Sequence, residues 1–274
     1  MANNRKTRFN RRHIFKFFPT FSKRQKLIAG VLVLSLGLFI SQNLLGKSGV
    51  YTVFSLAFLT DIILLLILYR DLKENFSPQL FILPFLFSLA FGLFYFLVPA
   101  RFLTRLATTS LYALGLYSLF LSENIFIVSS IRTIALLTSA RTVSFTITLL
   151  SYFFLSNVVL SLHFNIYIFI PFLLIYSFLL IIHSLWTHTL DKNVFANLYW
   201  VLGLTVCLIE IGILVWFWPS TPTVLALFLT GIFYATVGIS QVWIEKRLFK
   251  GVLWEYMWIA VVVFVTLLLF TPWT

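Results

Sequence analysis

Two acidic residues interrupt apolar runs of the sequence and are the first candidates for chemistry. Asp61 lies in FLTDIILLL, and Glu210 lies in CLIEIGIL. Ionisable groups inside long apolar segments are rare and tend to mark routes of ions or substrates. Removal from water favours the neutral form of a carboxylic acid, so each residue is a candidate proton-exchanging group. The alternative is a protonated carboxyl that only hydrogen-bonds a neighbouring helix.

Small residues accompany Glu210 in the sequence. On a helix, where successive residues turn by about 100°, Gly203 and Cys207 lie within about 60° of Glu210. The run at 222–243 carries a matching set of small or polar residues, namely Gly231, Ala235, Gly238 and Gln241. Because small residues let two backbones approach closely, we expect the helices at 195–217 and 222–243 to pack together there. Glu210 would then face protein, with Gln241 as a further polar contact nearer the inner end.

A third group of polar residues lies in SENIFIVSSIRTIALLTSARTV, residues 122–143. Arg132 and Arg141 are candidate anion contacts at the inner face of a membrane, with Glu123 and Asn124 in the same segment. The two arginines are nine residues apart, which places them on opposite sides of one helix. We therefore expect an interfacial helix at about 124–138, then a break, and Arg141 snorkelling at the start of the next span.

Patterns for metal, cofactor or nucleophilic chemistry find little support. The single cysteine, Cys207, excludes an internal disulfide and a thiolate zinc cluster. The sequence has no HExxH or GxSxG motif, and SQNLLGKS at 41–48 lacks the first glycine of a phosphate-binding loop. Ser184, His188 and Asp191 share one side of a helix end, where simple solvation is the alternative to a metal or proton relay. We predict no metal and no cofactor, and the sequence leans against an enzyme.

The elements that must carry these residues are membrane-spanning helices. Of the 274 residues, 61% are apolar and 10% are charged, against about 25% charged in a soluble domain. Apolar runs of about twenty residues match the length of a helix that crosses a bilayer. We predict an all-α polytopic bundle of about nine spans, at about 27–45, 50–69, 80–99, 104–121, 142–162, 166–187, 195–217, 222–243 and 252–270.

The distribution of positive charge distinguishes nine spans from ten. Lys and Arg collect in short cytoplasmic loops. With nine spans and the N-terminus inside, 17 of the 20 basic residues lie inside, and only Lys47, Arg101 and Arg105 lie outside. A tenth span at 122–143 would give 11 inside, 8 outside and Arg132 in lipid, where an arginine costs about 2.5 to 3.5 kcal/mol. The distribution favours nine spans with the N-terminus inside and the C-terminus outside.

The chain divides into a basic cytoplasmic arm at 1–26 and one transmembrane domain at 27–274, with a cytoplasmic interfacial segment at 122–141. The arm holds nine basic residues and no acidic residue, which predicts contact with anionic lipid as well as an orientation signal. A nucleic-acid or ribosome contact and a twin-arginine export signal in NRRHIFKFF are the less favoured alternatives. We expect a multi-pass protein of the cytoplasmic membrane with no nucleic-acid partner.

Four segments carry a resemblance to a known group of proteins: LVPARFLTRL, LYALGLYSLFLSENIF, IRTIALLTSAR and GIFYATVGISQ. They resemble uncharacterised multi-span membrane proteins encoded by small-genome candidate-phylum bacteria, most clearly over residues 97–142. The group has an Asn near position 127, where this chain has Ile127. The resemblance implies a multi-span architecture and no activity. It adds interest to the polar residues of that stretch, which are Arg101, Arg105, Glu123, Asn124, Arg132 and Arg141.

Three functions are compatible with these patterns. The leading hypothesis is a protein that binds or transports a small solute or lipid-like molecule between its helices, with Asp61 and Glu210 as proton-linked or polar contacts. A second is a non-catalytic membrane scaffold that docks a protein partner through its basic segments. A third is an enzyme that acts on a lipid-linked substrate at the inner face, with basic loops holding its phosphates.

Overall fold

A computed structural model describes residues 22–44, 49–72, 77–98, 101–129, 135–190 and 197–272. Within these ranges the chain forms nine α-helices, each long and apolar enough to cross a membrane, which confirms the predicted all-α, nine-span fold. The helices are α1 (Lys23–Leu44), α2 (Gly49–Leu72), α3 (Ile82–Leu97), α4 (Phe102–Ser129), α5 (Leu137–Ser161), α6 (Ile166–Thr189), α7 (Leu198–Trp216), α8 (Pro222–Ile244) and α9 (Lys250–Leu269). A short 3-10 turn, η3 (Pro78–Phe81), precedes α3.

The ends of the helices follow from local chemistry. Pro222 begins α8 and Pro78 begins η3, where a missing backbone N–H leaves no unpaired donor. Leu190 ends α6 in the left-handed conformation, with its N–H donating to the Trp186 carbonyl. Lys246 also has a positive φ, of 56°, in the turn between α8 and α9. Between such ends, backbone groups pair within each helix, as an apolar surrounding requires, except where Pro171 inside α6 supplies no N–H.

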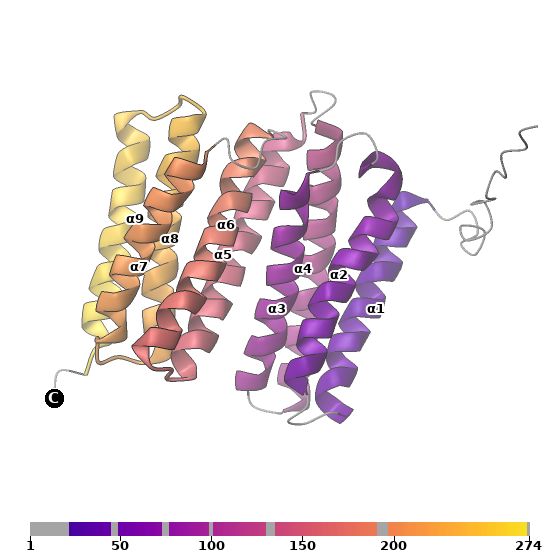
Figure 1. Cartoon of the computed structure of the whole chain (residues 1–274), viewed down its shortest axis with the longest axis horizontal. Coiled ribbons are helices and arrows are strands. Elements are labelled where there is room, and N and C mark those ends of the chain that lie inside the picture. The colour runs from indigo at the N-terminus through magenta and orange to yellow at the C-terminus, as the bar shows by residue number, and fades with distance from the viewer. Residues whose placement is uncertain are drawn as a thin grey trace, which may run out of the picture.

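The helices form an elongated bundle in which α5 joins two groups (Figure 1). Helix α5 packs against α3 and α4 on one side and against α6 and α8 on the other. Its most apolar stretch is 67% buried, whereas that of α9, at the edge of the bundle, is 6% buried. Successive helices run in opposite directions, so Lys23, Arg141 and Arg247 lie at one end of the bundle, which we call the basic end.

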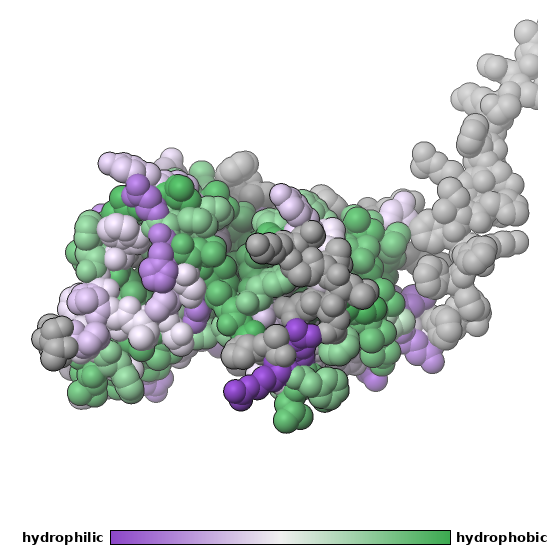
Figure 2. Space-filling model, turned by 90° about the horizontal axis from the view of Figure 1, so that it is seen from below, coloured by the Kyte–Doolittle hydropathy of each residue, from purple (hydrophilic) through white to green (hydrophobic). Residues whose placement is uncertain are grey.

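The flanks of the bundle are apolar. Large exposed hydrophobic side chains occur along α1, α2, α7 and α9, among them Leu36, Phe58, Leu214 and Trp258. Figure 2 looks at the end of the bundle at which the C-terminus lies, where green hydrophobic residues form much of the rim and paler or purple polar residues lie over the end. Apolar flanks with polar ends are what a bilayer requires of a multi-pass membrane protein.

The segment at 122–143 differs from its predicted form. We expected an interfacial helix at about 124–138, but α4 continues without a break to Ser129, and α5 begins at Leu137. Glu123 is 0% exposed, so the end of α4 lies inside the bundle and not on its face. Enclosure by neighbouring helices removes the reason for these polar residues to seek the interface. Arg132 and residues 1–21 of the basic arm lie outside the described residues.

Candidate functional site

Glu123 of α4 and His183 of α6 meet in the interior of the bundle. Oε1 of Glu123 lies 3.5 Å from Nε2 of His183, and both side chains are 0% exposed. Each residue is six positions before the last residue of its helix at the basic end, a depth of about 9 Å at 1.5 Å per residue. Charged groups are almost never fully buried unless they are paired, so this contact is the strongest candidate for a functional site.

The other contacts of His183 define its tautomer. Nδ1 lies 3.0 Å from the backbone oxygen of Gln79 in η3. Because a carbonyl oxygen only accepts, we assign the hydrogen of the neutral ring to Nδ1, which leaves Nε2 as an acceptor. Nε2 also lies 3.2 Å from Oγ of Ser144 in α5. Four elements therefore converge on one imidazole, and its free nitrogen faces a carboxyl and a hydroxyl.

Several oxygen atoms around this pair lack a donor. Within the described residues, both carboxyl oxygens of Glu123 are buried without a hydrogen-bond partner, as are Oε1 of Gln79 and Oδ1 of Asn124. Asp61 of α2 interacts electrostatically with Glu123, and its Oδ1 is also buried without a partner. Buried polar atoms without partners are uncommon in native structures and call for a proton, a water or an ion. We refer to Asp61, Glu123 and His183 as the acidic core.

The acidic core does not favour the binding of a metal ion. Among the described residues, no three His, Cys, Asp or Glu side chains lie close enough together to hold a metal ion. A proton needs only one lone pair and suits an imidazole nitrogen that faces a carboxyl. The arrangement can therefore hold a proton between Glu123 and His183, with Asp61 as a second carboxyl deeper in the bundle.

Hydroxyl groups fasten the helices that carry the acidic core. Thr60 donates to the backbone oxygen of Leu56, so its oxygen accepts from Ser88 at 2.9 Å. Ser88 in turn accepts from the Tyr112 hydroxyl at 3.0 Å. This oriented chain joins α2, α3 and α4 next to Asp61. It ends on a carbonyl, so it holds the three helices in register and supplies no free donor to the acids.

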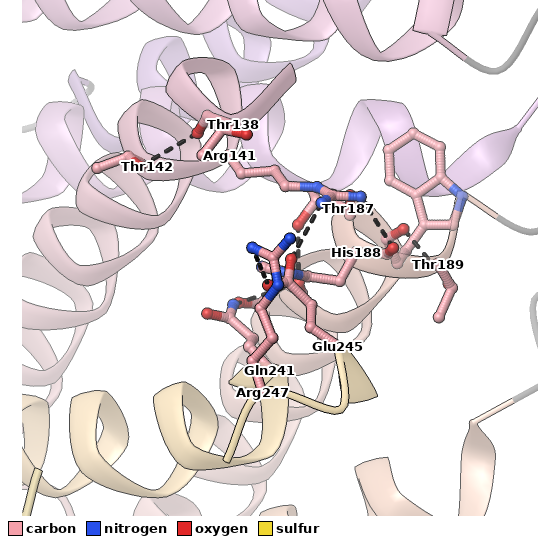
Figure 3. Close-up of polar contacts among 11 residues, drawn as sticks. Thr138, Arg141, Thr142, Thr187, His188, Thr189, Gln241, Glu245 and Arg247 are labelled. Atoms are coloured by element: carbon pink, nitrogen blue, oxygen red, sulfur yellow. Dashed lines mark hydrogen bonds and ion pairs between the residues drawn. The ribbon is translucent and has the colours of Figure 1, made fainter. Parts of the chain in front are cut away.

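A second polar cluster lies at the basic end, and Figure 3 shows its members from α5, α6 and the end of α8. Arg141 donates to the backbone oxygens of Thr187 and His188, at 3.0 and 2.9 Å, and to Oε1 of Glu245 at 3.0 Å. The same Glu245 oxygen lies 2.8 Å from Nδ1 of His188. Arg141 thus binds the carbonyls at the C-terminus of α6 and holds the end of α8 against it. We call this cluster the arginine clamp.

A family model described as Protein of unknown function (DUF5656) matches residues 32–270. The chain belongs to this family. The match runs from within α1 to the end of α9 and includes the acidic core and the arginine clamp. Neither a curated protein nor a solved structure matches the chain, so no activity can be transferred to it. Membership in an uncharacterised multi-span family is confirmed, and the bacterial source that the resemblance implied stays a prediction.

In this DUF5656 protein, Asp61 and Glu210 do not share a site. Asp61 joins Glu123 in the acidic core, but Glu210 lies on the exposed face of α7. The expectation that Glu210 faces protein is wrong for the single chain. Gln241 is also apart from the acids, because its amide donates to Oγ of Ser184 at 2.6 Å near the arginine clamp.

The small residues of α8 pack against α9 and not against α7. A Cβ atom placed on Gly231 would lie 2.6 Å from Val263, and one on Gly238 would lie 2.4 Å from Tyr256, both in α9. Ala235, between them, is also buried. A Cβ atom on Gly203 would meet none of the described residues within 4 Å, and Cys207 one turn later is half-buried. The predicted seam between α7 and α8 at these residues is therefore wrong.

The predicted anion contacts also have other roles. Arg141 has all of its described contacts within the protein, since its guanidinium binds α6 and Glu245. Glu123 belongs to the interior of the DUF5656 bundle, and Asn124 is half-buried. Arg132 and Asp191 lie outside the described residues. His183 is the residue that the sequence patterns missed. Because Glu123 is remote from His183 in the sequence, the only local signal of the site was a histidine within an apolar run.

Proposed function

We propose that this protein binds or moves a small solute or lipid-like molecule within its helix bundle, and that a proton exchanges at the acidic core during that cycle. The observation that carries the proposal is the full enclosure of Glu123 against His183, with no described residue donating to either carboxyl oxygen. Buried polar groups with a purely structural role have hydrogen-bond partners in the large majority of native structures. Ionisable groups at membrane depth mark proton or substrate routes.

One proton is enough to keep the Glu123 and His183 pair neutral. A protonated Glu123 can donate to Nε2 of a neutral His183, or the same proton can reside on the imidazole as an ion pair with the carboxylate. Both forms have no net charge, so neither leaves an isolated charge in the apolar interior. Loss of the proton leaves a carboxylate near Asp61 in that interior. Exchange is therefore tied to an opening of the helices that lets water reach the pair.

The position of the pair suits such an opening. Glu123 belongs to the group α1 to α4, and His183 belongs to α6 on the other side of α5. A shift between these two groups would separate the carboxyl from the imidazole. Proton occupancy would then bias the packing of one group against the other, which is the requirement for coupling a proton to a bound molecule.

The proposed orientation places the basic end in the cytoplasm. The described basic residues at that end are Lys23, Arg24, Lys26, Arg70, Arg141, Lys246, Arg247 and Lys250, and those at the opposite end are Arg101 and Arg105. Short cytoplasmic loops carry the excess of Lys and Arg. This supports a cytoplasmic-membrane protein with its N-terminus inside, where the basic arm would contact anionic lipid.

Infrared difference spectroscopy of the protein in lipid vesicles tests proton exchange without knowledge of the solute. The carboxylic C=O stretching band is recorded as the pH is stepped across the neutral range. We expect a pH-dependent band that Glu123→Gln removes and that the control variant Glu255→Gln, at an exposed carboxyl of α9, retains. A wild-type spectrum without the band, or a band that Glu123→Gln leaves intact, would overturn the proposal.

Access of water to the acidic core separates transport from scaffolding. In a Cys207→Ser background, Asp61→Cys is treated with a membrane-impermeant thiol reagent from each side. The exposed positions Phe249 and Leu162, at opposite ends of the bundle, serve as Cys controls for the two sides. Labelling of Asp61→Cys from both sides supports transport. Labelling of the controls alone would favour a scaffold, and a partner protein should then co-purify.

A further inference from the structure

Helix α7 presents a regular stripe of residues to the outside of the molecule. The stripe consists of Tyr199, Gly203, Val206, Glu210, Ile213 and Phe217, spaced alternately four and three residues apart; Ile213 is half-buried and the others are exposed. Tyr199 is 92% exposed, Val206 53% and Phe217 68%. Alternating steps of four and three form the heptad pattern with which two helices pack along a common seam. In the single chain, nothing in the described residues packs on this stripe at Gly203.

Glu210 places a carboxyl near the middle of a span, whereas the exposed Glu255 is the sixth residue of α9 and lies nearer the basic end. Glu210 is the thirteenth residue of the nineteen in α7, so it lies well within the span. Its side chain is exposed, and within the described residues it has no hydrogen bond or ion pair. Ionisable residues at such depth almost always face protein or a water-filled cavity. A carboxyl here needs a polar partner from outside the chain.

Gly203 lies two turns from Glu210 on the same stripe and provides room for a close approach. A Cβ atom at Gly203 would meet nothing within 4 Å, whereas at Gly212 on another face of α7 it would lie 2.1 Å from Leu173 of α6. Gly212 therefore serves packing within the chain, and Gly203 does not. Small residues at a membrane helix surface let a second backbone pack closely.

We propose that the α7 stripe is the interface of a symmetric dimer, in which Glu210 pairs with the partner subunit's Glu210. Two copies inserted with the same orientation would place their α7 helices in parallel, and residues of a parallel heptad seam meet their own counterparts. A protonated carboxyl both donates and accepts, so two such groups satisfy one another across a two-fold axis. Another protein would need a matching polar group at the same depth, which a second copy has by symmetry. This proposal is independent of the acidic core.

Disulfide cross-linking in native membranes tests the interface. Val206→Cys, on the stripe, is compared with Val262→Cys on α9, both in a Cys207→Ser background. The two valines are similarly exposed, at 53% and 59%, and both helices begin at the basic end. We expect oxidant to convert Val206→Cys to a species of twice the chain mass and to leave Val262→Cys monomeric. Equal cross-linking at both positions indicates random collision, and no cross-linking at Val206→Cys indicates a lipid-facing helix. Either result overturns the proposal.

Substitutions at Glu210 and Gly203 test the chemistry of the pairing. Dimerisation is measured by energy transfer between differently labelled copies in vesicles at several dilutions. We expect Glu210→Leu to weaken dimerisation about tenfold, the scale of one strong hydrogen-bonded contact between membrane helices. Glu210→Gln should retain the dimer, because an amide also donates and accepts.

Gly203→Leu should weaken the dimer while leaving the monomer folded, because its side chain enters open space in the single chain. Thermal unfolding of the monomer in detergent provides the check on folding. If Glu210→Leu and Gly203→Leu both associate as wild type does, the stripe is not the interface. A cross-linked product with the mass of a complex with a different protein would also overturn the proposal. It would show that the stripe binds that protein and not a second copy of this chain.

Discussion

The imidazole of His183 and the carboxyl of Glu123 contact each other at 3.5 Å with neither side chain exposed to the surroundings. Three helices and a 3-10 turn hold this contact, since Gln79 and Ser144 also reach the ring. The contact joins the group α1 to α4 to α6. Its loss should therefore affect both the stability of the bundle and any proton exchange.

Replacement of His183 by alanine should strongly destabilise the protein. The substitution leaves the Glu123 carboxyl buried without its partner and creates a cavity, which together cost about 3 to 5 kcal/mol. His163→Asn is the control, because His163 is exposed, bonds only the nearby Ser161 carbonyl among the described residues, and has a positive φ that asparagine tolerates. We expect the free energy of unfolding of this control variant to stay within about 0.5 kcal/mol of the wild-type value. Tryptophan fluorescence during thermal unfolding in detergent measures both.

A double variant distinguishes an unpaired charge from lost packing. Glu123→Leu combined with His183→Leu removes both polar groups and keeps most of the volume, and replacement of a buried pair by apolar residues is often neutral or stabilising. The double variant should unfold at a higher temperature than His183→Ala. If it unfolds at the same temperature or lower, packing around the ring and not its pairing with Glu123 is what matters.

Arg141→Gln should loosen the basic end of the bundle. The arginine donates to two carbonyls at the end of α6 and to Glu245, and hydrogen bonds of charged groups contribute about 1.5 to 3 kcal/mol each. Arg247→Gln is the control, since Arg247 is 74% exposed and lies 3.8 Å from the same carboxylate. Hydrogen exchange of the last turn of α6 should rise in Arg141→Gln and stay at the wild-type level in Arg247→Gln. Equal exchange in both variants would show that the clamp does not hold α6.

Gly231→Leu should disturb the contact of α9 with α8. A Cβ atom at this position would lie 2.6 Å from Val263, and overpacking of a well-packed contact costs about 1 to 3 kcal/mol. Gly203→Leu meets open space and should leave the unfolding temperature of the monomer unchanged. Proteolysis in the α8–α9 turn, near Arg247, reports the displacement of α9. Equal cleavage of both variants would contradict the assigned packing of α8.

The sequence predicted the nine helices because apolar length is a local property. Each run of about twenty apolar residues must form a helix in a bilayer, whatever lies beside it. The boundaries of eight spans agree with the structure to within a few residues, and the exception is α4, which extends to Ser129. The predicted span ended before Glu123, the first charged residue after the apolar run. The helix continues because neighbouring helices enclose the Glu123 side chain, which is fully buried.

Asp61 was identified from the sequence by its depth alone, but its role depends on contacts that depth does not encode. The direction in which a side chain points is set by which helices pack together, and α5 brings α3 and α8 into contact with itself although neither is its neighbour in the chain. For this reason Glu210, equally deep, faces outward, and Glu123 meets His183. The sequence by itself determined what kind of element each segment forms, because the bilayer acts on each segment separately. Only the tertiary structure decided which polar groups meet, because helix packing joins residues that no local pattern connects.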